Sequence, residues 1–196
     1  MSTQQSRIDL NALFVAGAEP TAANFADVFT SNLNLEDDST VTGAVTFTGG
    51  VNPGVKLLVA GAANTVTAAD SGKIIVFNVA VATLCTLPAP ALGMKFTFIT
   101  SIAATGDHEI QALTDGHGFL GGVTVTSTTA AKADFFSAAA AGSDDFITQT
   151  GGTNGGGAGS MITITALSST SGAGCWLVSG NLLGTGATTV TPFAAA

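Results

Sequence analysis

From residue 55 onward the chain repeats one pattern, in which short runs rich in Val, Ile, Thr and Phe alternate with turn signals built from Gly, Pro, Asp and Ser. Runs of this length and composition favour β-strands, and many of them at short spacing are typical of a sandwich or a jelly roll. Phe96 and Phe98 share one strand face, as do Ile162 and Ile164. No long helical pattern follows Asp38, which argues against an α/β enzyme scaffold.

The fold class we expect is therefore mostly β, with a β-sandwich or jelly-roll-like domain over residues 55–196. The expected strands are 56–60, 65–68, 73–80, 82–87, 94–102, 108–113, 123–128, 132–138, 144–150, 161–167, 175–178 and 188–192. The glycine-rich stretch 151–160 lacks the Lys-Ser/Thr ending and the following helix of a phosphate loop, so we expect a flexible hairpin loop there.

The first 54 residues follow other patterns. Apolar residues recur at helical spacing before and after Pro20, which predicts a short two-helix N-terminal arm over residues 1–38. Residues 39–54 alternate Thr and Gly with Val, Ala and Phe and end in the turn Asn52-Pro53-Gly54, which predicts an extended strand linker. Two short helices cannot bury their apolar faces alone, so we expect them to pack on each other, on the β domain or on another chain.

Charge is scarce in this sequence. Charged residues make up 9% of the chain and hydrophobic ones 46%, with a formal net charge of -8. A soluble monomer of this size usually carries about 25% charged residues, so the surface is either neutral or buried in partners. The few basic residues are scattered, and nucleic-acid and anionic-lipid binding both need them clustered. The uncharged window 74–92 has the length of a membrane span, but its Pro, Thr and Asn residues favour two buried strands meeting at a corner.

Few residues could carry chemistry. Cys85 and Cys175 lie in apolar runs and are expected to be buried free thiols. His108 and His117 lack the ligand spacing of a metal site, and the Asp pairs at 37–38 and 144–145 are expected to lie in surface turns. No nucleophile with a positioned base can be identified. We therefore predict no catalytic residue, no cofactor and no metal ligand, and expect that the protein is not an enzyme.

Three stretches together resemble bacteriophage particle proteins. Residues 12–21, followed by Phe25, Asp27 and the acidic stop at 33–38, resemble an N-terminal segment that recurs in phage fibre and head-decoration proteins. Residues 40–49 are similar to the Thr/Gly linkers of trimeric phage fibres. Residues 69–73, 87–90, Gly93 and 96–99 resemble a β domain of marine phage structural proteins, which tends to end in a Gly-rich hairpin and a Trp-containing strand, as residues 151–160 and 175–178 do here.

The resemblance implies a homotrimeric virion protein that is assembled in the host cytoplasm and anchored at one end to the particle. Its partners would be further copies of itself and the major capsid protein or other virion proteins. The residues that we expect to make the partner and trimer contacts are the apolar ones of the arm, Phe14, Phe25, Phe29 and Leu33, and those of the linker, Val41, Val45 and Phe47.

Three functions remain to be distinguished. The first is a capsid decoration, cement or head-fibre protein that stabilises the outer shell, which the small size favours. The second is a short tail fibre or baseplate component that binds host surface glycans through loops 106–118 and 151–159, although only Phe119 and Trp176 lie near these loops as stacking platforms. The third is a small polysaccharide depolymerase, which no catalytic constellation supports.

Overall fold

The computed structural model describes residues 53–61, 63–139, 143–168 and 175–195 of the chain, here called the β domain. It contains strands and two short 3₁₀ helices, η1 (Ala68–Asp70) and η2 (Asp115–His117). The strands are β1 (Val55–Leu58), β2 (Ala63–Thr65), β3 (Ile74–Phe77), β4 (Thr83–Thr86), β5 (Lys95–Thr100), β6 (His108–Gln111), β7 (Phe119–Ser127), β8 (Lys132–Ser137), β9 (Phe146–Gln149), β10 (Met161–Ala166), β11 (Trp176–Gly184) and β12 (Phe193–Ala194).

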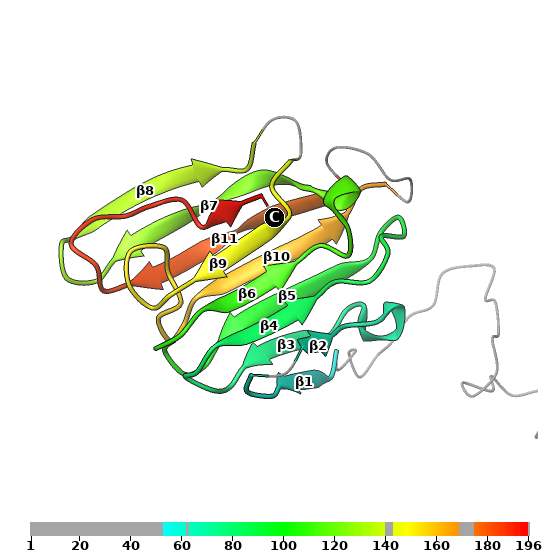
Figure 1. Ribbon diagram of the computed structural model, residues 1–196, viewed down its shortest axis with the longest axis horizontal. Coiled ribbons are helices and arrows are strands. Elements are labelled where there is room, and N and C mark those ends of the chain that lie inside the picture. Colours follow the sequence, from blue (N-terminus) through cyan, green and yellow to red (C-terminus); the bar gives the residue numbers. More distant parts are fainter. Residues whose placement is uncertain (1–52, 62, 140–142, 169–174, 196) are drawn as a thin grey trace, which may run out of the picture. The chain divides into compact units, whose positions relative to one another are not determined.

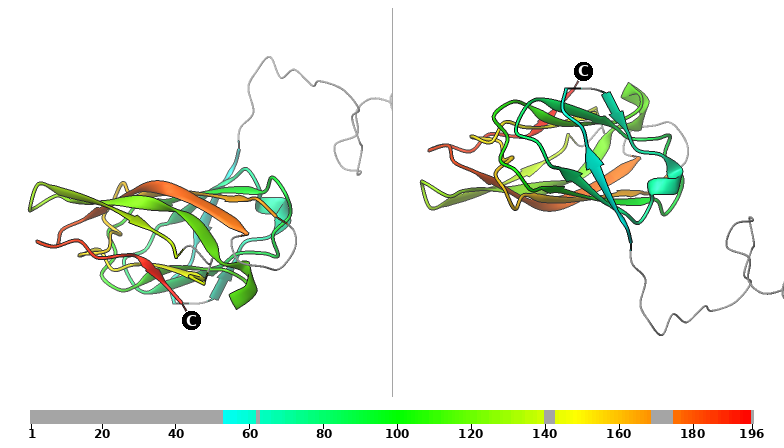
Figure 2. Two further views of the ribbon diagram at one scale, coloured as in Figure 1. Left: turned by 90° about the horizontal axis from the view of Figure 1, so that it is seen from above. Right: turned by 90° about the horizontal axis from the view of Figure 1, so that it is seen from below.

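These strands form two sheets that pack face to face (Figures 1 and 2). The seven-stranded sheet has the order β1-β3-β5-β10-β11-β7-β8, and the five-stranded sheet has the order β12-β9-β6-β4-β2. Each sheet contains both parallel and antiparallel neighbours.

The first six strands alternate between the two sheets. β1, β3 and β5 lie side by side and parallel in the larger sheet, and β2, β4 and β6 do the same in the smaller one. The chain therefore winds as a coil that places one strand in each sheet per turn. The later strands complete both sheets, with β10 antiparallel to β5 and β9 antiparallel to β6.

The core lies between the sheets and is rich in large side chains. Phe77 and Phe98 come from neighbouring strands of the coil, and their ring centroids are 6.1 Å apart. Phe96 lies 6.0 Å from the ring of Trp176, which joins the coil to the later strands. All four rings are essentially inaccessible to solvent. Burial of a large aromatic side chain contributes several kcal/mol, so this cluster stabilises the contact between the coil and the strands that follow it.

Asp70 ties the first turn of the coil to the second. Its carboxylate accepts hydrogen bonds from the Lys56 ammonium on β1 at 2.6 Å, from the Lys73 ammonium at 2.9 Å and from the Thr67 backbone N–H at 2.9 Å. Burial alone would raise the pKa of this carboxyl, but the hydrogen bonds from the two lysines and from Thr67 outweigh it and hold the pKa well below its usual range.

We expect Asp70→Asn to lower the free energy of unfolding by about 2 kcal/mol at pH 7, because two partly buried ammonium groups lose their carboxylate. Because the pKa of Asp70 is lower in the folded state than in the unfolded state, its carboxylate contributes its full stabilisation at any pH above the unfolded pKa. This stabilisation is lost as the pH falls from the unfolded pKa through the folded pKa. The difference between wild type and variant should stay constant down to about pH 5 and shrink only below about pH 4. Urea denaturation across this range measures it. The control is Asp134→Asn, whose exposed ion pair with Lys132 should matter much less; equal losses in the two variants would contradict the role given to Asp70.

The mostly β fold expected from the sequence is confirmed, and the two packed sheets are consistent with a sandwich. The parallel pairing in the coil differs from the antiparallel pairing of a jelly roll. The window 74–92 contains strands β3 and β4, and no helix in the described ranges is long and apolar enough to cross a membrane. The predicted two-helix arm over 1–38 gains no support, because it and nearly all of the linker over 39–54 lie outside the described residues.

Two other expectations are wrong in detail. Residues 188–192 were expected to form the last strand, but the pairing is made by Phe193 and Ala194, because the Phe193 side chain is the one that reaches the core. Residues 151–160 were expected to be a flexible hairpin loop. They instead connect β9 in the smaller sheet to β10 in the larger one, so they are not a hairpin.

Candidate interaction surface

The residues predicted to make partner contacts all lie in the first 52 positions. Phe14, Phe25, Phe29 and Leu33 of the expected arm and Val41, Val45 and Phe47 of the expected linker are therefore outside the described residues. Their roles stay predictions. Within the β domain, another surface also carries apolar side chains that no described residue covers, and it is the candidate interaction surface.

This surface is the outer face of the seven-stranded sheet. Along β3, Ile75 and Phe77 are buried in the core, so Ile74 and Val76 must leave the strand on the opposite, outward side. The strand registers align four outward residues in one row across β1, β3, β5 and β10. We call them the apolar row: Leu57, Val76, Ile99 and Met161.

The apolar row is accessible to solvent and continues into its neighbours. Leu57 is 57% exposed and Met161 is 48% exposed, which is high for side chains of this size. Val55 and Ile74 stand beside the row on β1 and β3. Further across the sheet the outward residues are neutral and mostly small and polar, such as Thr163 and Ser179, which are register partners.

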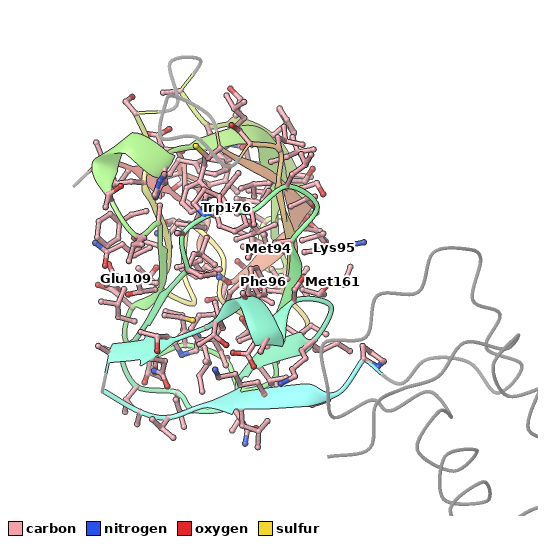
Figure 3. The ribbon with its side chains drawn as sticks, turned by 90° about the vertical axis from the view of Figure 1, so that its right-hand side faces the viewer. Met94, Lys95, Phe96, Glu109, Met161 and Trp176 are labelled. Carbon is pink, nitrogen blue, oxygen red and sulfur yellow. The ribbon has the colours of Figure 1, made fainter. Side chains whose placement is uncertain are left out.

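Charge is nearly absent from this face. Lys95, at the start of β5, is the one charged side chain at an outward position of the sheet as described. Asp134 lies in β8 opposite the fully buried Val125, so it leaves the strand on the inner side, where it pairs with Lys132. Figure 3 shows Lys95 and Met161 on one outer side of the domain, with Phe96 and Trp176 between the sheets.

The outer side of the five-stranded sheet is different. Glu109 stands on its central strand, β6, and its carboxylate accepts a hydrogen bond from the Thr148 hydroxyl on β9 at 3.4 Å. In Figure 3 Glu109 lies on the side opposite Lys95 and Met161. The two outer faces of the sandwich thus differ in chemistry. The outer face of the seven-stranded sheet carries the apolar row and no carboxylate in its described strands, whereas the outer face of the five-stranded sheet carries a carboxylate at its centre.

The glycine-rich segment 151–159 is packed rather than open. Residues 154–157 are buried, and the Gly157 N–H donates to the Leu183 carbonyl at 2.6 Å. The Asn154 side-chain carbonyl accepts from the Thr150 backbone N–H at 3.0 Å. A Cβ at Gly155 would come within 2.5 Å of Leu182. Glycine is needed here for close approach to β11, and much of the segment is not available for ligand recognition.

Three side chains with reactive groups, Cys85, Cys175 and His108, are buried in the core. Cys85 and Cys175 are buried thiols outside any disulfide, as expected, and burial raises the pKa of the Cys85 thiol to about 12, which leaves it unreactive. His108 stacks on Phe77 with ring centroids 4.6 Å apart, and it is fully buried. Burial lowers the pKa of His108 against the opposing effect of the Val79 and Val81 backbone, so the ring is neutral at pH 7.

The remaining candidate ligands do not form a site in the described ranges. His117 Nδ1 lies 3.2 Å from the Thr114 hydroxyl, and the Asp144 carboxylate accepts from the Ala139 N–H at 2.6 Å. Asp145 is buried rather than in the surface turn expected for it. Within these ranges no group of three His, Cys, Asp or Glu side chains converges as metal ligands would.

The chain matches no family model, and no curated protein is significantly similar to it. The function must therefore be inferred from the outer face of the seven-stranded sheet. One signal in the sequence could have located it: Ile74-Ile75-Val76-Phe77 is apolar without alternation. A strand that is apolar on both sides is stable when both of its sides are buried, but a domain of two sheets buries only one side of each sheet.

Proposed function

We propose that this protein is a structural component of a bacteriophage particle, which binds and stabilises the outer capsid shell as a decoration, cement or head-fibre protein. The observation that carries the proposal is the exposed apolar row on the outer face of the seven-stranded sheet, because a virion structural protein acts through contacts with further copies of itself and with other particle proteins. A contiguous apolar patch on a soluble protein usually marks an interaction surface. The three stretches that resemble phage particle proteins, which begin at residues 12, 40 and 69, support the particle as the place of that interaction.

A structural role fits the rest of the β domain better than catalysis does. Cys85 and His108 are sealed in the core, where they cannot meet a substrate. Tight packing of residues 154–157 removes much of one of the two loops that a glycan-binding tail protein would use, which favours the capsid over the tail. In the proposed assembly, copies associate as a trimer, and the apolar residues of the first 52 positions contribute further contacts.

Co-sedimentation of the purified full-length protein with empty capsids that lack it tests this proposal. We expect saturable binding, and we expect Phe25→Ala combined with Phe29→Ala to weaken it at least tenfold if the N-terminal residues grip the shell. The control is Leu92→Ala, which shortens an exposed apolar side chain in the loop between β4 and β5, away from the seven-stranded face. No binding to capsids, together with binding to host glycans on an array, would overturn the proposal in favour of the tail.

A further inference from the structure

The parallel part of the seven-stranded sheet lacks a layer. Parallel strands occur almost always with both faces covered, because their residues are apolar on both sides. β1, β3 and β5 follow this composition, with Leu58, Phe77 and Phe98 buried inward and Leu57, Val76 and Ile99 facing outward. The core supplies the inner cover, and no described residue supplies the outer one.

Charge restricts what can cover this face. Each copy of the chain carries a formal net charge of -8. Carboxylates brought together in a contact between two copies would repel each other, so a contact surface without carboxylates is favoured. The outer face of the seven-stranded sheet meets this condition, since no acidic residue of the β domain stands at an outward position on it. The outer face of the five-stranded sheet does not, because it carries the Glu109 carboxylate on its central strand.

The size of the face is sufficient for a stable contact. Seven strands spaced about 4.8 Å apart, each contributing about six residues of about 3.3 Å, present on the order of 600 Å² in projection. The accessible area of such a side-chain surface exceeds its projection, which brings it close to the roughly 800 Å² that each partner buries in a standard interface.

We propose that the outer face of the seven-stranded sheet is the surface through which copies of this chain associate, and that the apolar row Leu57, Val76, Ile99 and Met161 is the apolar part of this contact. Association covers the outward residues of the parallel strands and leaves Glu109 of each copy exposed to solvent or to other partners. The inference deepens the proposed function by naming the self-association surface of a virion protein, and it is tested without capsids. Its failure is therefore distinguishable from a failure to bind the shell.

The test is the native mass of the full-length protein by light scattering at micromolar concentration. Wild type should have a multiple of the 19.2 kDa chain mass. Ile99→Glu places a carboxylate in the apolar row and should weaken association at least tenfold, giving the single-chain mass. Thr86→Glu, on the outer face of the five-stranded sheet, is the matched control and should leave the oligomer intact.

Met161→Glu is the second variant, since Met161 is half exposed at the start of β10 and its replacement leaves the core unchanged. Circular dichroism and Trp176 fluorescence check that each variant is folded. A monomeric wild type would overturn the inference. So would a folded Met161→Glu variant that keeps the wild-type mass, because copies would then meet elsewhere.

Discussion

Gly151→Ala should lower the free energy of unfolding by more than about 3 kcal/mol, a large effect for a single added methyl group. Gly151 has a φ of 79°, and a Cβ on it would lie 2.1 Å from the Ala104 carbonyl oxygen. The left-handed backbone by itself costs a non-glycine residue roughly 1–2 kcal/mol. The remainder comes from the backbone clash, which forces apart the segment linking the two sheets.

The matched control is Gly93→Ala. Gly93 has a φ of 84°, but no atom lies within 4 Å of the place where its Cβ would stand. The control carries the same backbone strain without the clash and should cost only about 1–2 kcal/mol. Thermal denaturation followed by circular dichroism compares the two. Equal losses would mean that segment 151–159 yields easily and is not the packed link described above.

Phe98→Ala has the second large expected effect, a loss of about 3–5 kcal/mol. Phe98 is 1% exposed on β5, packs against Phe77 and stands in register with Ile162 of β10. Removing its ring leaves a cavity where the coil meets the antiparallel part of the larger sheet.

Leu92→Ala is the comparison for Phe98→Ala, since Leu92 is 77% exposed in the loop between β4 and β5. We expect it to change stability by well under 1 kcal/mol, as is usual for surface substitutions. Denaturant titration with Trp176 fluorescence measures both variants. A Phe98→Ala variant as stable as Leu92→Ala would contradict the position of the core.

The strands could be predicted from the sequence where their alternation is strong. The expected segments 94–102 and 161–167 contain β5 and β10, because Phe96, Phe98, Ile162 and Ile164 mark one buried face. The expected strand 65–68 was displaced, since pairing is made by Ala63–Thr65 and the chain then turns into η1. Thr and Ala are tolerated in both conformations, so local preference did not decide this boundary.

The coil was not predicted, because parallel pairing joins residues far apart in the chain. Ile74 follows its register partner Val55 by 19 residues, and Thr97 follows Ile74 by 23. In the smaller sheet Leu84 follows Ala63 by 21 residues, and Glu109 follows Leu84 by 25. The spacing varies from turn to turn and the sequence does not repeat at a fixed period, so only the pairing itself identifies the coil.

The sequence predicted that the protein has an apolar contact surface, but it did not predict where in the β domain the candidate surface lies. The scarcity of charge predicted a surface that is either neutral or buried in partners. The apolar residues expected to make partner contacts were Phe25, Phe29 and their neighbours in the first 52 positions. The outer face of the seven-stranded sheet depends on register, which brings Leu57, Val76, Ile99 and Met161 together from four strands. Exposure of these residues follows from the two-layer architecture and not from any local pattern.

The central claim, that the protein belongs to a phage particle, is tested most directly by counting its copies in gradient-purified particles with quantitative mass spectrometry. The account predicts that the chain is present in a fixed ratio to the major capsid protein and in many copies per particle, as expected for a shell-binding protein. Absence from purified particles of a phage that expresses it would contradict the account.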